Sequence, residues 1–336
     1  MNQNRRDLYD RLEQKRHSKV ISYFTSTRQG METAIGADVM EFFADQLDAI
    51  GPTIKITLFL FTTGGSTSAA WNIANLLMMF CDEFEVVVPS LARSAGTLIC
   101  LGAKQIIMTK QATLGPIDPS INLPLNPQIP HAGPQARAPV SVEAIKGYLE
   151  LAKQEMGIKD DIGLSNILVK LSDMVHPLVL GEVMRIRSQI QMLAEKLLKA
   201  HVTDIDTVHR IIAFLCSESG SHDYTINRRE ARELGLDIVT PGPEEYDIIK
   251  ALYGDIRDEL LMKSPFDPKT EIGINTTINF SFKRAIIESL QGGSDYFISE
   301  GQLSKIQLPI QPNIPPQFAL NDQRTFEGWR HFDEDT

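Results

Sequence analysis

The sequence predicts an α/β fold, in which helices pack on a sheet of parallel strands. Two observations favour it: two strand–turn–helix units follow one another, and both turns contain glycine or other small residues. In order, their parts are a buried-type strand over 55–61, the turn Gly64-Gly65, a helix over 66–80, a strand over 84–89, the turn Arg93-Ser94, a helix over 95–103 and a strand over 105–109.

The segment before these units predicts three further elements. A polar helix runs to about Lys15, and an apolar strand lies within 19–26. Apolar residues at helical spacing then predict a helix over 37–50. That helix is expected to stop at Gly51-Pro52, because this pair of residues commonly ends helices.

After these units the sequence predicts a long loop and then a mostly helical region. Residues 113–139 hold seven prolines and no periodicity, which indicates a loop. About 141–262 is mostly helical. It includes an apolar-striped helix over 173–200 and a later helix that Asn227 caps and Gly235 ends.

The last part of the chain predicts strands over 276–289 and 295–308 around Gly292-Gly293. The acidic end that follows is expected to be frayed. The expected organisation has three parts: an N-terminal helix over 1–17, a main domain over 18–262 with a helical insertion at about 141–216, and a small β-containing C-terminal extension over 263–336.

Composition and charge exclude several classes of protein. With 336 residues, 43% of them hydrophobic, the chain can bury a large core. Its net charge of −10 disfavours nucleic acid and anionic membranes as partners, because these bind basic surfaces. Cys81, Cys100 and Cys216 lie in apolar contexts without C-x-x-C spacing, which indicates reduced thiols and a cytoplasmic setting. No window approaches the roughly 18 apolar residues of a membrane span. The histidines are scattered, so neither a metal nor another cofactor is expected.

The two turns carry the candidate chemistry. Ser94 begins the second helix, whose N-terminus offers unpaired N–H groups and the positive end of a dipole. A substrate carbonyl could reach the Ala95 amide, because the neighbouring residues are small. The Gly65 amide, with Gly64 beside it, could converge on the same oxygen if the two strands are neighbours. One hydroxyl and two donors would make an acyl-transfer site, although the same residues also fit plain turns with helix caps.

Three blocks of sequence, in this order, resemble the serine dehydrogenase proteinase family of Clp-type peptidases. They are FTTGGSTSAAWNIANLL, VVVPSLARSAGTLICLGAKQIIMTKQATLGPIDP and SHDYTINRREARELGL. The resemblance covers about 18–250 and implies a Clp/crotonase-like spiral of ββα units, shared with Clp proteolytic subunits and signal peptide peptidase A. It implies that Ser94 is the nucleophile and that Gly65 and Ala95 form the oxyanion hole. The helix INRREARELGL would close the core near the active site.

The general base departs from the family pattern. Clp proteolytic subunits place a His in a loop where this chain has Ile117 and Asp118, so no Ser-His-Asp triad carries over. Signal peptide peptidases instead use a Lys well beyond the Ser, and Lys146 lies at a comparable position. A Lys in an apolar pocket can be neutral near pH 7 and accept the Ser proton. Lys153 or Lys170 could take its place.

His222 is the rival base, because its segment SHDYTI aligns with the stretch just after the triad Asp of Clp subunits. Histidine also has the better ordinary pKa for proton transfer. Asp118 could orient a base beside the site, or it could serve only the turn of a Pro-rich loop.

Three functions are open from the sequence. The first is a serine peptidase that cleaves peptides or unfolded protein segments. The second is a catalytically inactive Clp-like scaffold or partner-binding module, which the missing His favours. The third is a crotonase-type acyl-CoA enzyme, which leaves Ser94 without a role.

The resemblance and the motifs also suggest partners. The chain has no phosphate-binding loop, so a separate ATPase or regulatory partner would have to deliver folded proteins to it. Proteins of the resembled fold commonly assemble into rings or smaller oligomers. A homo-oligomer is therefore expected, and the helix over 173–200 is a candidate contact, unless its stripe belongs to the core.

Overall fold

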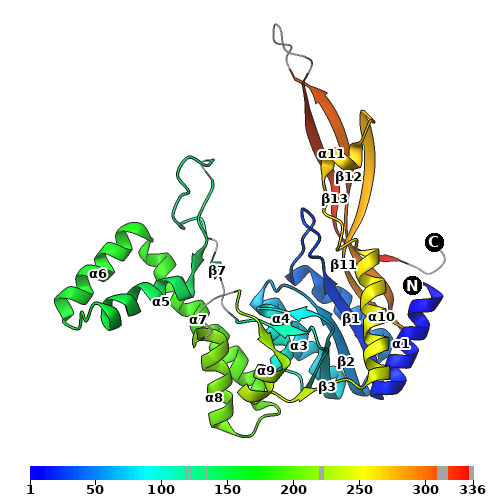
Figure 1. The fold of residues 1–336 in the computed structure, drawn as a ribbon, viewed down its shortest axis with the longest axis horizontal. Coiled ribbons are helices and arrows are strands. Elements are labelled where there is room, and N and C mark those ends of the chain that lie inside the picture. The colour runs from blue at the N-terminus through cyan, green and yellow to red at the C-terminus, as the bar shows by residue number, and fades with distance from the viewer. Residues whose placement is uncertain (118–119, 122, 134, 219–222, 309–316, 333–336) are drawn as a thin grey trace.

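A computed structural model describes residues 1–117, 120–121, 123–133, 135–218, 223–308 and 317–332 (Figure 1). The helices are α1 (Gln3–Arg16), η1 (Ala37–Val39), α2 (Met40–Ile50), α3 (Thr67–Phe80), α4 (Ala95–Leu101), α5 (Val142–Glu150), η2 (Leu151–Glu155), α6 (Asp161–Met174), α7 (Pro177–Lys199), α8 (Ile205–Ala213), η3 (Phe214–Glu218), α9 (Arg228–Leu234), α10 (Pro243–Glu259) and α11 (Pro268–Ile272). The strands are β1 (Lys19–Thr25), β2 (Thr53–Phe61), β3 (Cys81–Val88), β4 (Leu91–Ala92), β5 (Gln105–Met108), β6 (Thr113–Leu114), β7 (Ser120–Ile121), β8 (Val140–Ser141), β9 (Ile226–Asn227), β10 (Ile238–Val239), β11 (Thr277–Ser289), β12 (Gly293–Gln307) and β13 (Phe318–Phe332).

The main sheet has eight strands in the order β10-β5-β3-β2-β1-β11-β12-β13. The first five run parallel to one another, as the strand–turn–helix units predict. The last three strands join antiparallel, beginning with β11 beside β1. The predicted α/β class is confirmed, and the C-terminal strands extend the same sheet.

Three of the parallel strands, β2, β3 and β5, are followed by short extended segments that pair with one another. Thr62 follows β2 and forms a parallel bridge with Ala92 of β4, which itself follows β3. β4 in turn pairs in parallel with β6, which follows β5. Helices α3 and α4 lead the chain back to the main sheet. This repeat of two strands and a helix is the spiral of ββα units that the resemblance implies.

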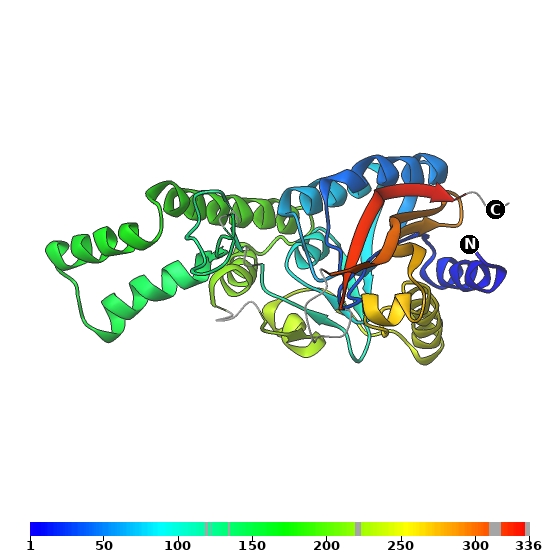
Figure 2. The same cartoon turned by 90° about the horizontal axis from the view of Figure 1, so that it is seen from above.

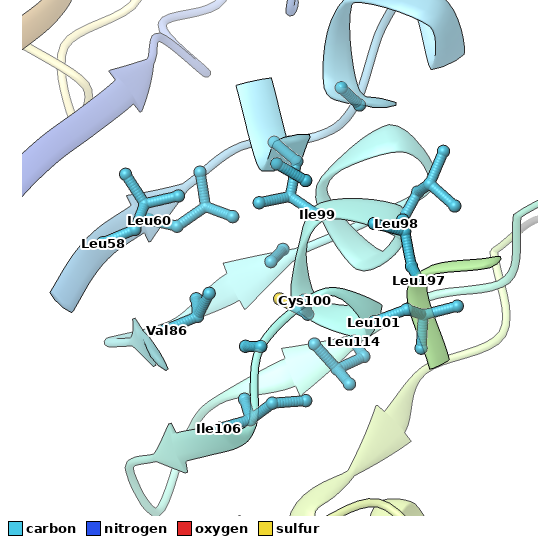
Figure 3. Close-up of a cluster of buried hydrophobic side chains, with 14 of the residues drawn as sticks. Leu58, Leu60, Val86, Leu98, Ile99, Cys100, Leu101, Ile106, Leu114 and Leu197 are labelled. Carbon is cyan, nitrogen blue, oxygen red and sulfur yellow. The ribbon is translucent and has the colours of Figure 1, made fainter. Parts of the chain in front are cut away.

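The main sheet lies between two layers of helices. On one face α2, α3 and α4 pack through buried side chains such as Ile73 and Ile99. On the other face α1 and α10 pack through side chains such as Leu12 and Leu252. Figure 3 shows α4 enclosed by apolar side chains of β2, β3, β5, β6 and α7. Burying a large aliphatic side chain of this kind stabilises the fold by about 1.5–3 kcal/mol.

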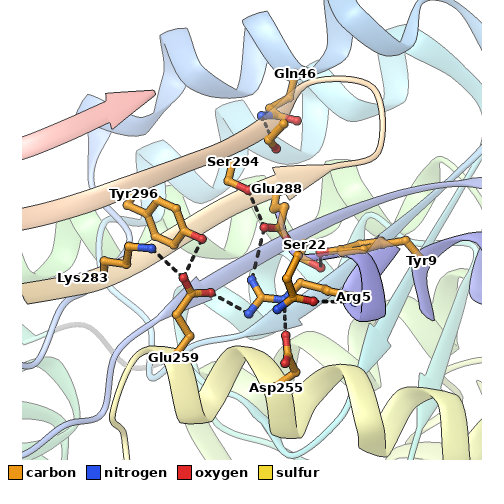
Figure 4. A network of polar contacts seen from close by, with 12 residues as sticks. Arg5, Tyr9, Ser22, Gln46, Asp255, Glu259, Lys283, Glu288, Ser294 and Tyr296 are labelled. Atoms are coloured by element: carbon orange, nitrogen blue, oxygen red, sulfur yellow. Dashed lines mark hydrogen bonds and ion pairs between the residues drawn. The ribbon is translucent and has the colours of Figure 1, made fainter. Parts of the chain in front are cut away.

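A buried polar network fastens α1 to the sheet and to α10 (Figure 4). Arg5 of α1 pairs with Asp255 and, at 2.6 Å, with Glu259, both on α10. Its guanidinium also lies 3.2 Å from the buried Glu288 carboxylate of β11. Three carboxylates around one cation compensate the charge of Arg5, which a helix on this apolar face could not otherwise bury.

Helices α5 and α6 and the N-terminal part of α7 project from the body as an arm, seen in both Figure 1 and Figure 2, whereas the C-terminal part of α7 packs in the core through side chains such as Leu197. Here the predicted helix over 173–200 begins later, at Pro177. The residue before a proline avoids helical backbone, and His176 is extended and caps α7 by accepting the Leu178 N–H at 3.2 Å. Among the helices that the structure describes, none is both long and apolar enough to cross a bilayer.

Strand β13 at the edge of the main sheet was not expected from the sequence, whereas the acidic last residues 333–336, expected to be frayed, lie outside the described residues. Trp329 explains the order of β13. The indole packs near the rings of Tyr23, Phe42 and Phe297 and donates from Nε1 to Asp38 at 3.1 Å. These contacts lie far apart in the sequence, so composition alone does not reveal them.

Candidate functional site

Ser94 lies in the turn between β4 and the first residue of α4. Its backbone has φ 51° and ψ −115°, a region that non-glycine residues rarely adopt. The turn is held on both sides, since Arg93 N–H donates to Thr62 O at 3.0 Å and Gly96 N–H donates to Arg93 O at 2.8 Å. Ser94 itself is half-buried, so part of this residue is accessible at the turn.

Helix α4 gives this turn a fixed base. All seven residues from Ala95 to Leu101 are buried. Thr97 Oγ1 lies 2.8 Å from both Ala92 O and Gly115 O and accepts the Gly115 N–H at 3.1 Å. These contacts join the helix to the strand before it and to the loop after β6, so Ser94 has little freedom to move.

The glycine turn lies directly against the serine turn. A Cβ atom added to Gly64 would be 2.8 Å from Ser94 Cβ and 3.4 Å from Ala95 N. Gly64 and Gly65 have φ values of 116° and 142°, which favour glycine. The condition that the two strands are neighbours is met, because β2 and β3 pair in parallel.

Within the described residues, the two expected oxyanion donors donate to no backbone carbonyl and so remain available. Gly65 bridges Ile35 through the Gly64 carbonyl and the Ser66 amide, so its own N–H points away from that strand. Neither this amide nor the Ala95 amide has a hydrogen-bond acceptor within the described part of the chain. Ala95 is buried, and a buried amide without an acceptor is suited to hold a developing negative charge. Their catalytic role stays a prediction.

The candidate bases are not brought to this site by the described structure. Lys146 lies on α5, with Nζ 3.5 Å from Glu150, and both views show α5 in the arm, apart from α4. Lys153 and Lys170 belong to the same arm, in η2 and α6. Asp118 and His222 lie outside the described residues. The identity of the base stays a prediction.

Two threonines that sequence reasoning missed position the turns. Thr62 Oγ1 accepts the Gly64 N–H at 3.1 Å and a hydrogen bond from Thr25 at 2.8 Å. Thr97 connects α4 to Gly115. The sequence signal that could have identified them is a threonine inside an apolar stretch. A hydroxyl buried there needs a hydrogen-bond partner. As for metals, no group of three or more His, Cys, Asp or Glu ligands occurs within the described ranges.

The family model of ClpP-like SDH-type serine proteinases matches residues 1–135. Uncharacterized protein MJ0137 of Methanocaldococcus jannaschii is 32% identical over 250 residues, which cover 72% of this chain and 76% of that protein. The chain belongs to the ClpP-like SDH-type serine proteinases.

Other relatives of this ClpP-like SDH-type proteinase are more distant. Uncharacterized protein MJ1495 of the same organism is 27% identical over 250 residues, covering 72% of this chain and 74% of that protein. Two solved structures are each 15% identical. A mutant of the 1510-N membrane-bound stomatin-specific protease has a TM-score of 0.38 over 68% of this chain and 83% of its own. A mutant of ClpP1 from Listeria monocytogenes has a TM-score of 0.37 over 70% of this chain and 99% of its own.

Proposed function

We propose that this ClpP-like SDH-type proteinase is a peptidase that cleaves peptides or unfolded protein segments through an acyl-enzyme on Ser94. One observation carries the proposal: a strained, half-buried serine begins a buried helix and touches a glycine turn. Strained backbone of this kind concentrates at functional sites, because the surrounding fold must hold it in place. A purely structural serine would gain nothing from the same conformation.

The proposed reaction has two steps. Ser94 Oγ attacks the peptide carbonyl while a base accepts its proton, and the Ala95 and Gly65 amides stabilise the oxyanion. The protonated base then gives the proton to the leaving amine, which completes the acyl-enzyme. Water, deprotonated by the same base, attacks the ester and releases the acid and free Ser94.

Lys146 and His222 are the candidate bases in this proposal. A base must come within hydrogen-bond reach of the Ser94 hydroxyl. For Lys146 this requires movement of the arm or a second copy of the chain, because α5 lies apart from α4. We expect one of the two single variants, Lys146→Ala or His222→Ala, to abolish fluorophosphonate labelling of Ser94 at neutral pH, and the other to keep it. Loss in neither variant would contradict both assignments.

A fluorophosphonate probe tests the nucleophile directly. We expect the wild-type protein to be labelled, Ser94→Ala to fall to background, and Ser165→Ala to label like the wild type. Ser165 is a suitable control because it is an exposed serine on α6, within the arm. No labelling of the wild type between pH 6 and 9 would refute the peptidase and favour the inactive scaffold.

The setting and assembly of the protein are part of the same proposal. Cys81, Cys100 and Cys216 are not joined in disulfides, which fits a reducing cytoplasm. The arm exposes ten large apolar side chains between Tyr148 and Met192, each at least 40% accessible. Together they offer on the order of 1,000 Å², and a standard interface covers about 800 Å² on each partner. We therefore propose that a second copy of the chain covers the arm.

A further inference from the structure

Arg93, the residue before Ser94, has its backbone fixed by the same turn. Its N–H donates to Thr62 O, and its carbonyl accepts from Gly96. The stem of its side chain lies against Gly115, where an added Cβ atom would be 3.1 Å from Arg93 Cγ and 3.2 Å from Arg93 Cβ. The side chain is therefore held between the nucleophile turn and the loop that Thr97 binds.

The guanidinium of Arg93 has no partner within the described structure. Its Nε is buried and lacks a hydrogen-bond acceptor. Four arginines whose side chains are at most 12% exposed each pair with a carboxylate: Arg5 with Glu288, Arg16 with Glu85, Arg28 with Glu271 and Arg284 with Glu327. A buried donor left unpaired is costly, and native structures rarely keep one without a reason.

We propose that Arg93 binds a carboxylate of the substrate next to the scissile bond. The planar guanidinium presents a fork of N–H donors that matches the two oxygens of a carboxylate. The carboxylate can come from an acidic side chain or from the free C-terminus of a peptide. This inference rests on the proposed function, because it treats the Ser94 turn as the place where a peptide binds.

Gly115 supports the assignment from the other side of the arginine. Because it lacks a side chain, it leaves room for the Arg93 stem, and a Cβ atom would press on that stem at 3.1 Å. Gly115→Ala should therefore shift the guanidinium without removing its charge. We expect this variant to reduce the preference for a carboxylate partly, whereas Arg93→Gln removes it.

The test measures binding in the Ser94→Ala background, so it does not depend on turnover. Fluorescein-labelled peptides carry either Glu or Gln at the positions around the central bond, each with a free or an amidated C-terminus. We expect one acidic form to bind at least about 10-fold more tightly than its amide, the range of one charge-assisted hydrogen-bonded pair. The ratio of the affinities for the acidic and the amide peptide should fall to about 1 in Ser94→Ala/Arg93→Gln. The responsive peptide pair identifies the source of the carboxylate.

Arg185→Gln is the matched control, since Arg185 is an exposed arginine on α7 that pairs with Glu182. It should leave the ratio unchanged. Equal binding of acidic and amide peptides to Ser94→Ala, including no measurable binding of either, would overturn the inference. So would an unchanged ratio in Ser94→Ala/Arg93→Gln. An Asp118→Asn variant that abolishes the ratio equally would assign Arg93 to an internal pair instead. Fluorophosphonate labelling of Ser94 reports on the peptidase proposal separately.

Discussion

At the scale of single residues, Ser94 is held in a conformation that its own chemistry disfavours. A non-glycine residue at such φ and ψ values typically costs about 1–3 kcal/mol. The buried helix α4 on one side and the bridge between Thr62 and Ala92 on the other supply the restraint. Part of the folding free energy therefore keeps one hydroxyl at a fixed place beside Gly64.

Removing the side chain at this position should relieve the strain. We expect the free energy of unfolding of Ser94→Gly to exceed that of Ser94→Ala by about 1 kcal/mol, because glycine accepts positive φ. Urea denaturation followed by circular dichroism measures it. The pair Ser165→Gly and Ser165→Ala is the control, since within helix α6 alanine should be the more stable by about 1 kcal/mol. If the alanine variant were more stable than the glycine variant at both sites, the backbone of Ser94 would not be strained.

Gly64→Ala should disturb Ser94 without touching it chemically. The new Cβ would lie 2.8 Å from Ser94 Cβ and 3.0 Å from Arg93 O, at a φ of 116°. We expect a loss of about 1–3 kcal/mol in stability and at least about a 10-fold slower fluorophosphonate reaction. Gly181→Ala in α7 is the control, because no atom lies within 4 Å of its added Cβ. Labelling at the wild-type rate would show that the two turns are not coupled.

At the scale of elements, ion pairs rather than apolar contacts alone join α1 to the sheet. Glu85 of β3 is buried and accepts from Arg16 at 2.7 and 2.5 Å and from Thr57 at 2.6 Å, with Lys55 at 2.8 Å. Burial by itself opposes ionisation, but these donors outweigh it and hold the pKa of Glu85 below its ordinary value. The carboxylate is therefore the stable form in the folded protein.

Glu85→Gln should reveal this as a pH-dependent loss of stability. Because the folded pKa is lowered, the stabilisation is fully present above about pH 4.5 and is lost as the pH falls through the folded pKa. We expect the variant to lose about 3–5 kcal/mol near pH 7, and the gap to the wild type to narrow below pH 4.5. Unfolding measured from pH 7 to pH 3.5 checks it. Glu83→Gln, at an exposed pair with Lys104, should change little, and a pH-independent gap would contradict the assignment.

Local signals in the sequence predicted most elements of the core. Helix α9 starts after the Asn227 cap and ends at Gly235, whose φ of 108° only glycine adopts readily. Strand β3 begins at Cys81, earlier than expected, because α3 passes into it without a turn. The turn that holds Ser94 was also predictable, since a serine between small residues at a strand–helix junction is a local feature.

At the scale of the whole molecule, the sequence was less informative because distant segments decide the arrangement. The pairing of β1 with β11 joins residues more than 250 positions apart, for example Ile21 with Ser289. The order of β13 depends on Trp329 meeting Tyr23 and Phe42. The candidate site shows the same contrast. Adjacent strands bring Ser94 to Gly64, which local sequence could predict, whereas the proposed base would come from a distant segment that local sequence cannot identify.

The arm offers the last prediction, because a second copy of the chain is proposed to cover its exposed apolar side chains. Ile162 and Val169, on α6, are 75% and 63% exposed, and in that helix only Leu171 is buried among the described side chains. A 14-residue helix with so little packing is marginal by itself, so a covering surface is needed. We expect the wild type to be a homo-oligomer in sedimentation at micromolar concentration and Ile162→Lys/Val169→Lys to dissociate. Ile274→Lys, at a still more exposed position outside the arm, should leave the mass unchanged. A monomeric wild type, or an oligomer that survives the double substitution, would refute the second copy as the partner of the arm.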